Sequence, residues 1–197
     1  MASGRKIGLF GGTFDPVHSG HVTVAKEAAE QYGLDQVLLV PAAAPPHKHG
    51  AAAASYEDRL RMVELACQGD PRLVASRLEE NRAPSYTIDT VRRLKSTLQP
   101  EDELYFIIGA DAFREIATWH RWEDLLREVQ FIVATRPGHQ YATPPGARVH
   151  RLDTLALPVS SSEIRARLRA GELPPELPPA VLDYIRRKGL YGAPPEE

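Results

Sequence analysis

Cysteine and asparagine are scarce in this 197-residue chain, and long apolar runs are missing. Cys67 is the only cysteine and Asn81 is the only asparagine. A single cysteine excludes an internal disulfide framework and is typical of a protein in a reducing compartment. No run approaches the length of a membrane span, and no charged and then apolar leader opens the chain. We therefore expect a cytoplasmic protein with no membrane partner.

An excess of positive charge is also missing. Lys and Arg together number 24 against 26 Asp and Glu, which leaves a net charge of -2. Broad nucleic-acid binding favours a basic surface, so this balance predicts no nucleic-acid partner. The length suits one α/β domain with a substantial core, and we expect residues 1–197 to form that single domain. The sequence does not decide between a monomer and a homo-oligomer.

Short apolar runs alternate with amphipathic patterns along most of the chain. The predicted strands are Ile7–Phe10, Val37–Val40, Leu73–Ala75, Leu104–Ile108, Phe131–Ala134 and Val149–Leu152. The predicted helices are Val22–Tyr32, Tyr56–Cys67, Thr87–Leu98, Ala112–Ile116, Glu123–Glu128, Ile164–Leu168 and Ala180–Lys188. This alternation predicts an α/β fold with a Rossmann-like, doubly wound, mainly parallel sheet and helices on both faces. A helical segment at about 160–190 closes the chain.

Helix boundaries have their own signals. Ser55 and Ser160 are each followed three residues later by an acidic residue, the spacing of a capped helix start. Gly33 and Gly189 follow helical patterns and are expected to end them.

The most informative segment is GGTFDPVHSGH, residues 11–21, between the first predicted strand and the first predicted helix. Strand, glycine-rich turn and helix in this order build a phosphate site, because backbone N–H groups and the helix N-terminus face the ligand. His18 and His21 are three residues apart and lie on one face. Two histidines at this spacing are often incidental, and zinc is the other alternative. Zinc usually takes three or four ligands, and with Cys67 as the only cysteine we expect no metal site.

Four further segments each have two interpretations, one as part of a ligand site and one as ordinary structure. Lys48 in PPHK, within the predicted loop Pro41–Ala54, is either a solvated charge or a cation near a triphosphate. The hydroxyls of PSYTIDT, residues 84–90, either cap a helix or lie where its N–H groups bind an anion. IGAD, residues 108–111, ends a strand with a glycine that permits close approach and a carboxylate for ribose hydroxyls. Trp119 in WHRW either packs in the core or stacks on a flat heterocycle.

SSSEIR, residues 160–165, is the second phosphate candidate. Its hydroxyls lie at a helix start, and Arg165 follows within about one turn. A cation near a helix N-terminus is locally unfavourable, which favours a bound anion between Arg165 and the N–H groups.

In order and spacing, these motifs, with DYIRRKGLYG at residues 183–192, resemble the bacterial nicotinate mononucleotide adenylyltransferase family of the nucleotidyltransferase superfamily. The resemblance covers nearly the whole chain. One departure is Ser162, where the family commonly has threonine, and the hydroxyl is retained.

This resemblance implies transfer of the adenylyl group of ATP to nicotinate mononucleotide, with Mg²⁺ on the triphosphate. It implies catalytic roles for His18, His21, Lys48 and Arg165. The implied ATP-binding residues are Gly11, Gly12, Thr13, Phe14, Gly20, Gly109, Asp111, Ser161 and Ser162. The implied nicotinate nucleotide-binding residues are Ser85, Tyr86, Thr87, Trp119 and Arg136.

The same motifs are compatible with other functions. Phosphopantetheine or cytidylyl transfer uses the same HxGH signature, although PSYTIDT and Trp119 disfavour both. A non-catalytic nucleotide sensor and an RNA-binding protein are the alternatives outside enzymes. The basic residues of the motifs are all present, which argues against a non-catalytic sensor. The net charge of -2 argues against an RNA-binding protein.

Overall fold

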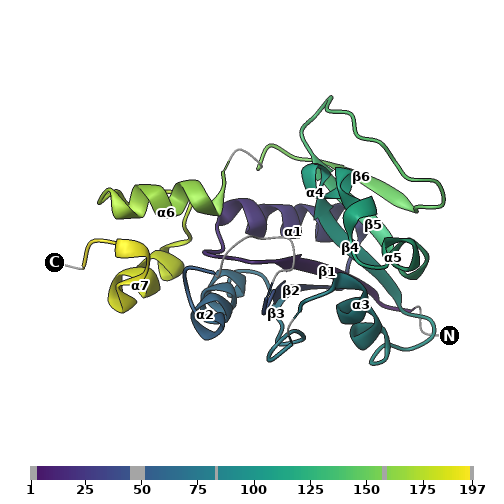
Figure 1. Ribbon diagram of the computed structural model, residues 1–197, viewed down its shortest axis with the longest axis horizontal. Coiled ribbons are helices and arrows are strands. Elements are labelled where there is room, and N and C mark those ends of the chain that lie inside the picture. Colours follow the sequence, from purple (N-terminus) through teal and green to yellow (C-terminus); the bar gives the residue numbers. More distant parts are fainter. Residues whose placement is uncertain (1–3, 45–51, 83, 157–158, 196–197) are drawn as a thin grey trace.

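A six-stranded parallel sheet forms the centre of the computed structural model, which describes residues 4–44, 52–82, 84–156 and 159–195 (Figure 1). The strands are β1 (Lys6–Gly12), β2 (Gln36–Pro41), β3 (Leu73–Ala75), β4 (Glu103–Gly109), β5 (Gln130–Thr135) and β6 (Val149–Asp153). Their order is β3-β2-β1-β4-β5-β6, and every neighbouring pair is parallel. The order reverses between β1 and β4, which is where a doubly wound sheet opens a ligand crevice. The predicted fold class and all six predicted strands are confirmed.

Helices cover both faces of this sheet. They are α1 (Ser19–Tyr32), α2 (Tyr56–Cys67), α3 (Thr87–Lys95), α4 (Ala110–Arg114), α5 (Trp122–Glu128), α6 (Ser161–Arg169) and α7 (Pro179–Lys188). Two short 3-10 helices are η1 (Ile116–Thr118) and η2 (Leu190–Gly192). None of the helices in the described part of the chain has the length and apolar character needed to cross a bilayer.

Several predicted helix boundaries were wrong. The helices predicted to begin at Val22 and Ile164 each begin three residues earlier, at Ser19 and Ser161. The helix predicted over Thr87–Leu98 ends at Lys95, where the Ser96 hydroxyl donates to the Arg93 carbonyl at 2.7 Å. A hydroxyl that bonds a nearby carbonyl competes with the helical ladder, so the apolar pattern alone overestimates the length. The helix predicted over Ala112–Ile116 begins two residues earlier, and Ile116 instead starts η1.

The predicted helix signals are confirmed at four positions. Ser55 accepts from the Asp58 N–H at 3.1 Å, and Ser160 accepts from the Glu163 N–H at 3.2 Å. Gly33 and Gly189 end α1 and α7 with φ near +62° and +63°, a left-handed conformation that favours glycine.

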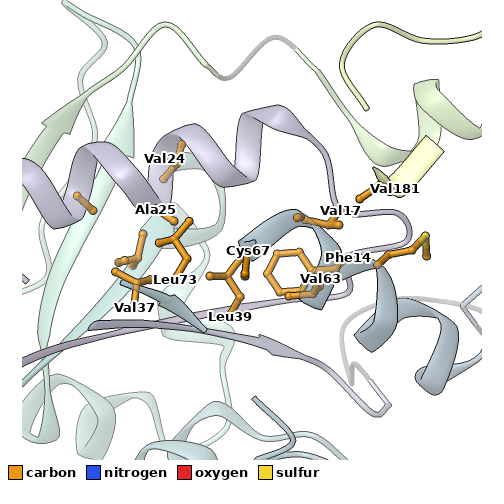
Figure 2. Close-up of a cluster of buried hydrophobic side chains, with 14 of the residues drawn as sticks. Phe14, Val17, Val24, Ala25, Val37, Leu39, Val63, Cys67, Leu73 and Val181 are labelled. Atoms are coloured by element: carbon orange, nitrogen blue, oxygen red, sulfur yellow. The ribbon is translucent and has the colours of Figure 1, made fainter. Parts of the chain in front are cut away.

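Alternating side chains divide the core into two clusters. Leu9 and Phe106 point toward α3, α4 and α5, whereas Tyr105 and Ile107 point to the face covered by α1. Figure 2 shows the second face, with Val24 and Ala25 of α1 close to Val37 and Leu39 of β2. This alternation follows from the two-residue period of a strand and accounts for the nearly continuous apolar strands of a sheet buried on both sides.

The C-terminal helices lie beyond the end of the sheet opposite the N-terminus (Figure 1). Ile164 and Leu168 of α6 and Val181 and Ile185 of α7 belong to the same buried cluster as α1. Their packing brings the residues around Ser160 to the carboxyl end of β1.

Candidate active site

The glycine-rich turn connects β1 to α1 and positions two histidines at the helix start. His18 is the N-cap of α1, with an extended backbone, and His21 occupies the third helical position. The His18 N–H donates to His21 Nδ1 at 3.2 Å, and the two ring centroids are 3.7 Å apart. The two predicted phosphate ligands therefore lie side by side.

The same hydrogen bond sets the chemistry of the His21 ring. Because Nδ1 accepts a hydrogen, the neutral ring carries its proton on Nε2, which is then a donor. His18 is only 5% exposed, and burial lowers its pKa to about 4, while Glu176 acts in the opposite direction. His18 is therefore neutral at pH 7, and its buried Nδ1 has no hydrogen-bond partner within the described residues.

Gly20 lies where two groups approach the backbone closely. A Cβ on this residue would lie 2.7 Å from the Ala156 carbonyl oxygen and 2.9 Å from His18 Nδ1. Any side chain would displace the His18 ring, so the glycine of HSGH is needed for steric reasons.

Asp15 joins four segments around the turn. Its carboxylate, 5% exposed, accepts from the N–H groups of Ala53 and Ala54 at 2.7 and 3.1 Å. The Tyr191 hydroxyl donates to the same carboxylate at 2.6 Å, and burial, followed by this contact, raises the pKa of Tyr191. Arg165 donates to the Asp15 carbonyl at 2.7 Å. Segments from both ends of the chain therefore hold the turn in one conformation.

Arg59 is a buried residue that stabilises the turn through hydrogen bonds. Its side chain is 1% exposed, and it donates to the carbonyls of Thr13, Ala42 and Ala54 at 2.7, 2.9 and 3.3 Å. Burial lowers the pKa of Arg59, and the nearby Asp15 carboxylate acts in the opposite direction. A buried guanidinium that satisfies three carbonyls fixes the ends of β1 and β2 relative to α2.

One pocket, which we call the Trp119 pocket, opens beside the turn at the carboxyl ends of β1, β2 and β4. Its lining is Leu9, Gly11, Gly12, Thr13, Val40, Ala42, Glu79, Ser85, Tyr86, Thr87, Thr90, Phe106, Trp119 and His120. The fold thus brings four predicted nicotinate contacts, Ser85, Tyr86, Thr87 and Trp119, to the predicted glycines of the phosphate turn.

The aromatic rings of this pocket support one another. Phe106 meets Trp119 edge-on at 6.2 Å, and Tyr86 stacks on His120 at 4.2 Å. The Ser85 hydroxyl, in contrast, is already engaged, since it accepts from the Ala44 N–H at 3.0 Å and donates to the Arg82 carbonyl at 3.3 Å. Ser85 therefore shapes the pocket, while Thr87 begins α3, whose first N–H groups have no partner within the helix.

Two further pockets adjoin each other on the other side of the turn. The His18 pocket is lined by Phe10, His18, Gly20, His21, Val24, Gly109, Ala134, Ala156, Val159, Ser160 and Ser161. The Asp111 pocket is lined by Gly109, Ala110, Asp111, Ala134, Thr135, Arg136 and His139. The two pockets share Gly109 and Ala134, so the predicted ATP residues Gly20, Gly109, Asp111 and Ser161 line adjoining pockets.

Several predicted residues lie elsewhere or differ in environment. Phe14 is 2% exposed and packs edge-on against His21 at 5.0 Å, so its side chain supports the histidine from the core. Ser162 is exposed and lines none of these pockets. Arg136, predicted as a nicotinate nucleotide contact, lines the Asp111 pocket and not the Trp119 pocket. Lys48 lies outside the described residues.

Arg165 has a protein partner that the sequence did not reveal. Besides the Asp15 carbonyl, its Nη1 lies 3.9 Å from the Asp15 carboxylate. The Ser161 hydroxyl donates to the Pro16 carbonyl at 2.9 Å, which also ties α6 to the turn. Asp15 thus gives Arg165 an anionic partner within the protein, and a bound anion between Arg165 and the helix N–H groups stays a prediction.

Sequence reasoning missed Asp15, Arg59 and Tyr191 as supports of the site. Arg59 carried a usable signal, because it stands three and four residues before buried Met62 and Val63 on the apolar face of α2. A cation at such a position needs internal acceptors. Tyr191 carried no comparable local signal.

Carboxylates and histidines do not gather into a metal-binding cluster in the part of the chain that the structure describes: no group of three or more ligating side chains occurs there.

Comparisons with known proteins find a matching family and close sequence relatives. The cytidylyltransferase-like family profile matches residues 9–167. A probable nicotinate-nucleotide adenylyltransferase of Solibacter usitatus is 55% identical over 94% of this chain and 99% of its own length. A relative of the same description from Geobacillus thermodenitrificans is 44% identical over 95% of this chain and 87% of its own.

A solved structure has the same fold. It is the Plasmodium falciparum nicotinic acid mononucleotide adenylyltransferase complexed with NaAD, with a TM-score of 0.79 and 21% identity over 96% of this chain and 98% of its own. At that identity it shows the fold alone, whereas the sequence relatives show the family. The chain therefore belongs to the cytidylyltransferase-like family, among the nicotinate-nucleotide adenylyltransferases.

Proposed function

We propose that this protein transfers the adenylyl group of ATP to nicotinate mononucleotide, giving nicotinate adenine dinucleotide and pyrophosphate in NAD biosynthesis. The observation that carries the proposal is the position of the turn from Gly11 to His21, which has the Trp119 pocket on one side and the His18 pocket on the other. Two nucleotides bound in these pockets would meet at the turn.

The His18 and Asp111 pockets are the proposed ATP side. The His21 Nε2–H and the N-terminus of α1 provide donors for phosphate oxygens. Gly109 leaves room for a nucleoside at the end of β4, and nothing lies within 4 Å of where its Cβ would be. Arg165 contributes the nearby positive charge.

The Trp119 pocket is the proposed acceptor side. Trp119 offers a face for a flat ring, and the start of α3 offers N–H groups and the positive end of the helix dipole to a carboxylate. An amide in the same place would direct an NH₂ group toward donors, and such a mismatch costs several kcal/mol. We therefore propose a preference for the acid over the amide acceptor.

The reaction needs positioning more than proton transfer. A phosphate oxygen of the acceptor attacks the α-phosphorus of ATP, the bond from that phosphorus to the bridging oxygen breaks, and pyrophosphate leaves with the electron pair. The attacking oxygen is already ionised near neutral pH, so the residues orient two anions and stabilise the developing charge.

We propose Mg²⁺ as the ion that accompanies ATP. The described residues contain no ligand cluster for it, and the Asp15 carboxylate is occupied by donors of the protein. Mg²⁺ commonly binds through substrate phosphates and retained water, which fits this ligand-poor site. When bound, it would reduce the negative charge of the triphosphate. We place the reaction in the cytoplasm, where a lone reduced cysteine is typical.

The test is pyrophosphate release with ATP and either pyridine mononucleotide, with the dinucleotide product identified by mass spectrometry. We expect kcat/KM to be about 100-fold or more higher for nicotinate than for nicotinamide mononucleotide. Phosphopantetheine and CTP serve as the alternative acceptor and donor. Turnover with either of them, and none with ATP and a pyridine mononucleotide, would contradict the proposal.

A further inference from the structure

Glu79 is a buried carboxylate that the proposed mechanism does not use. It lies in the segment between β3 and α3, is 7% exposed, and lines the Trp119 pocket. Thr90 of α3 donates to its Oε1 at 2.7 Å, and the Ala43 N–H approaches its Oε2 at 3.4 Å. Both oxygens thus accept hydrogens, which is the arrangement of an ionised carboxylate.

No cation within the described residues forms an ion pair with this carboxylate. Arg93 donates to the Leu78 carbonyl instead, and the buried guanidinium of Arg59 donates to three carbonyls and interacts with Glu79 only at longer range. An uncompensated charge at such a depth is costly, so a positively charged ligand beside it would be favoured.

The ring of a pyridine nucleotide carries such a charge. Its nitrogen is quaternary because it bonds to ribose, so the ring is a permanent cation whether the substituent is an acid or an amide. Trp119, in the same pocket, offers the aromatic face on which a cation is attracted. We propose that Glu79 is a specificity residue that provides the countercharge for the pyridinium ring of the acceptor; this inference rests on the proposed function.

Recognition in the Trp119 pocket is then divided between two groups. Glu79 and Trp119 select a cationic ring, and the first turn of α3 selects the carboxylate on that ring. The reaction does not need Glu79 as a general base, because the attacking phosphate oxygen of the acceptor is already ionised near neutral pH. The contribution of Glu79 is therefore electrostatic. We expect it to change the Kd of the acceptor even when no reaction takes place.

The experiment measures binding by calorimetry in the absence of ATP, using the full chain. One ligand is nicotinate mononucleotide, and the other is its C-glycoside isostere, in which a benzene ring replaces the pyridinium and the carboxylate is kept. We expect the wild type to bind the cationic ring about 10-fold more tightly. Glu79→Gln, which keeps shape and one acceptor, should bring the two Kd values within about threefold by weakening only the pyridinium ligand.

Thr90→Val is the matched control for a purely structural role. It removes the hydrogen bond to Glu79 but leaves the charge, so it should change the Kd of both ligands by the same factor. Equal weakening of both ligands in Glu79→Gln would overturn the proposal. Equal binding of the two by the wild type, or no binding of either, would overturn it without any variant. A wild type that prefers the cationic ring but releases no pyrophosphate would instead contradict adenylyl transfer.

Discussion

The hydrogen bond between Tyr191 and Asp15 joins residues 176 positions apart, and Tyr191→Phe removes it without leaving a cavity. A hydrogen bond to a charged group contributes about 1.5–3 kcal/mol. Asp15 would retain the N–H groups of Ala53 and Ala54, so we expect the lower half of that range, about 1.5–2 kcal/mol. For a chain of this size the melting temperature should fall by about 5 °C.

Thermal and urea unfolding followed by circular dichroism would measure this change. Tyr184→Phe is the matched control, because its hydroxyl also donates to a carboxylate, Asp58, at 2.8 Å. Asp58 is less buried than Asp15, and we expect a loss of only about 0.5 kcal/mol there. Equal losses in the two variants, or a Tyr191→Phe protein as stable as the wild type, would show that the C-terminal segment does not hold the turn.

Three further predictions concern the histidines and Arg165. His21→Ala should lower kcat about 10²–10³-fold while the melting temperature stays within about 2 °C; wild-type turnover would contradict its role as a phosphate donor. Because burial lowers the pKa of His18 to about 4, the unfolded state takes up a proton below pH 6.5 that the folded state refuses. Stability should therefore fall by up to about 3 kcal/mol as the pH drops from 6.5 to 4, and urea titrations of His18→Asn should lack this loss. Arg165→Lys should raise the KM for ATP about 10-fold, since an ammonium cannot serve Asp15 and a phosphate together; unchanged kinetics would make Arg165 a structural residue only.

Local patterns in the sequence determined the elements and the motif that carries the chemistry. Short runs of three to five residues predicted every strand, and the signal is clearest in β4 and β5, which are buried along most of their length and therefore nearly continuously apolar. Ser55, Ser160 and Gly33 marked helix ends through contacts within a few residues of themselves. The turn from Gly11 to His21 was visible for the same reason, since its glycines and histidines act within one short segment.

Only the tertiary structure decided what surrounds that turn. The strand order places β4 beside β1, and this pairing brings Gly109 to the His18 pocket and Trp119 to the other side. Asp15 meets Tyr191, and Glu79 faces the Trp119 pocket, through contacts between segments far apart in the chain. Periodicity and capping report only on neighbours along the helix or strand, whereas the partner of a buried charge depends on how those elements pack.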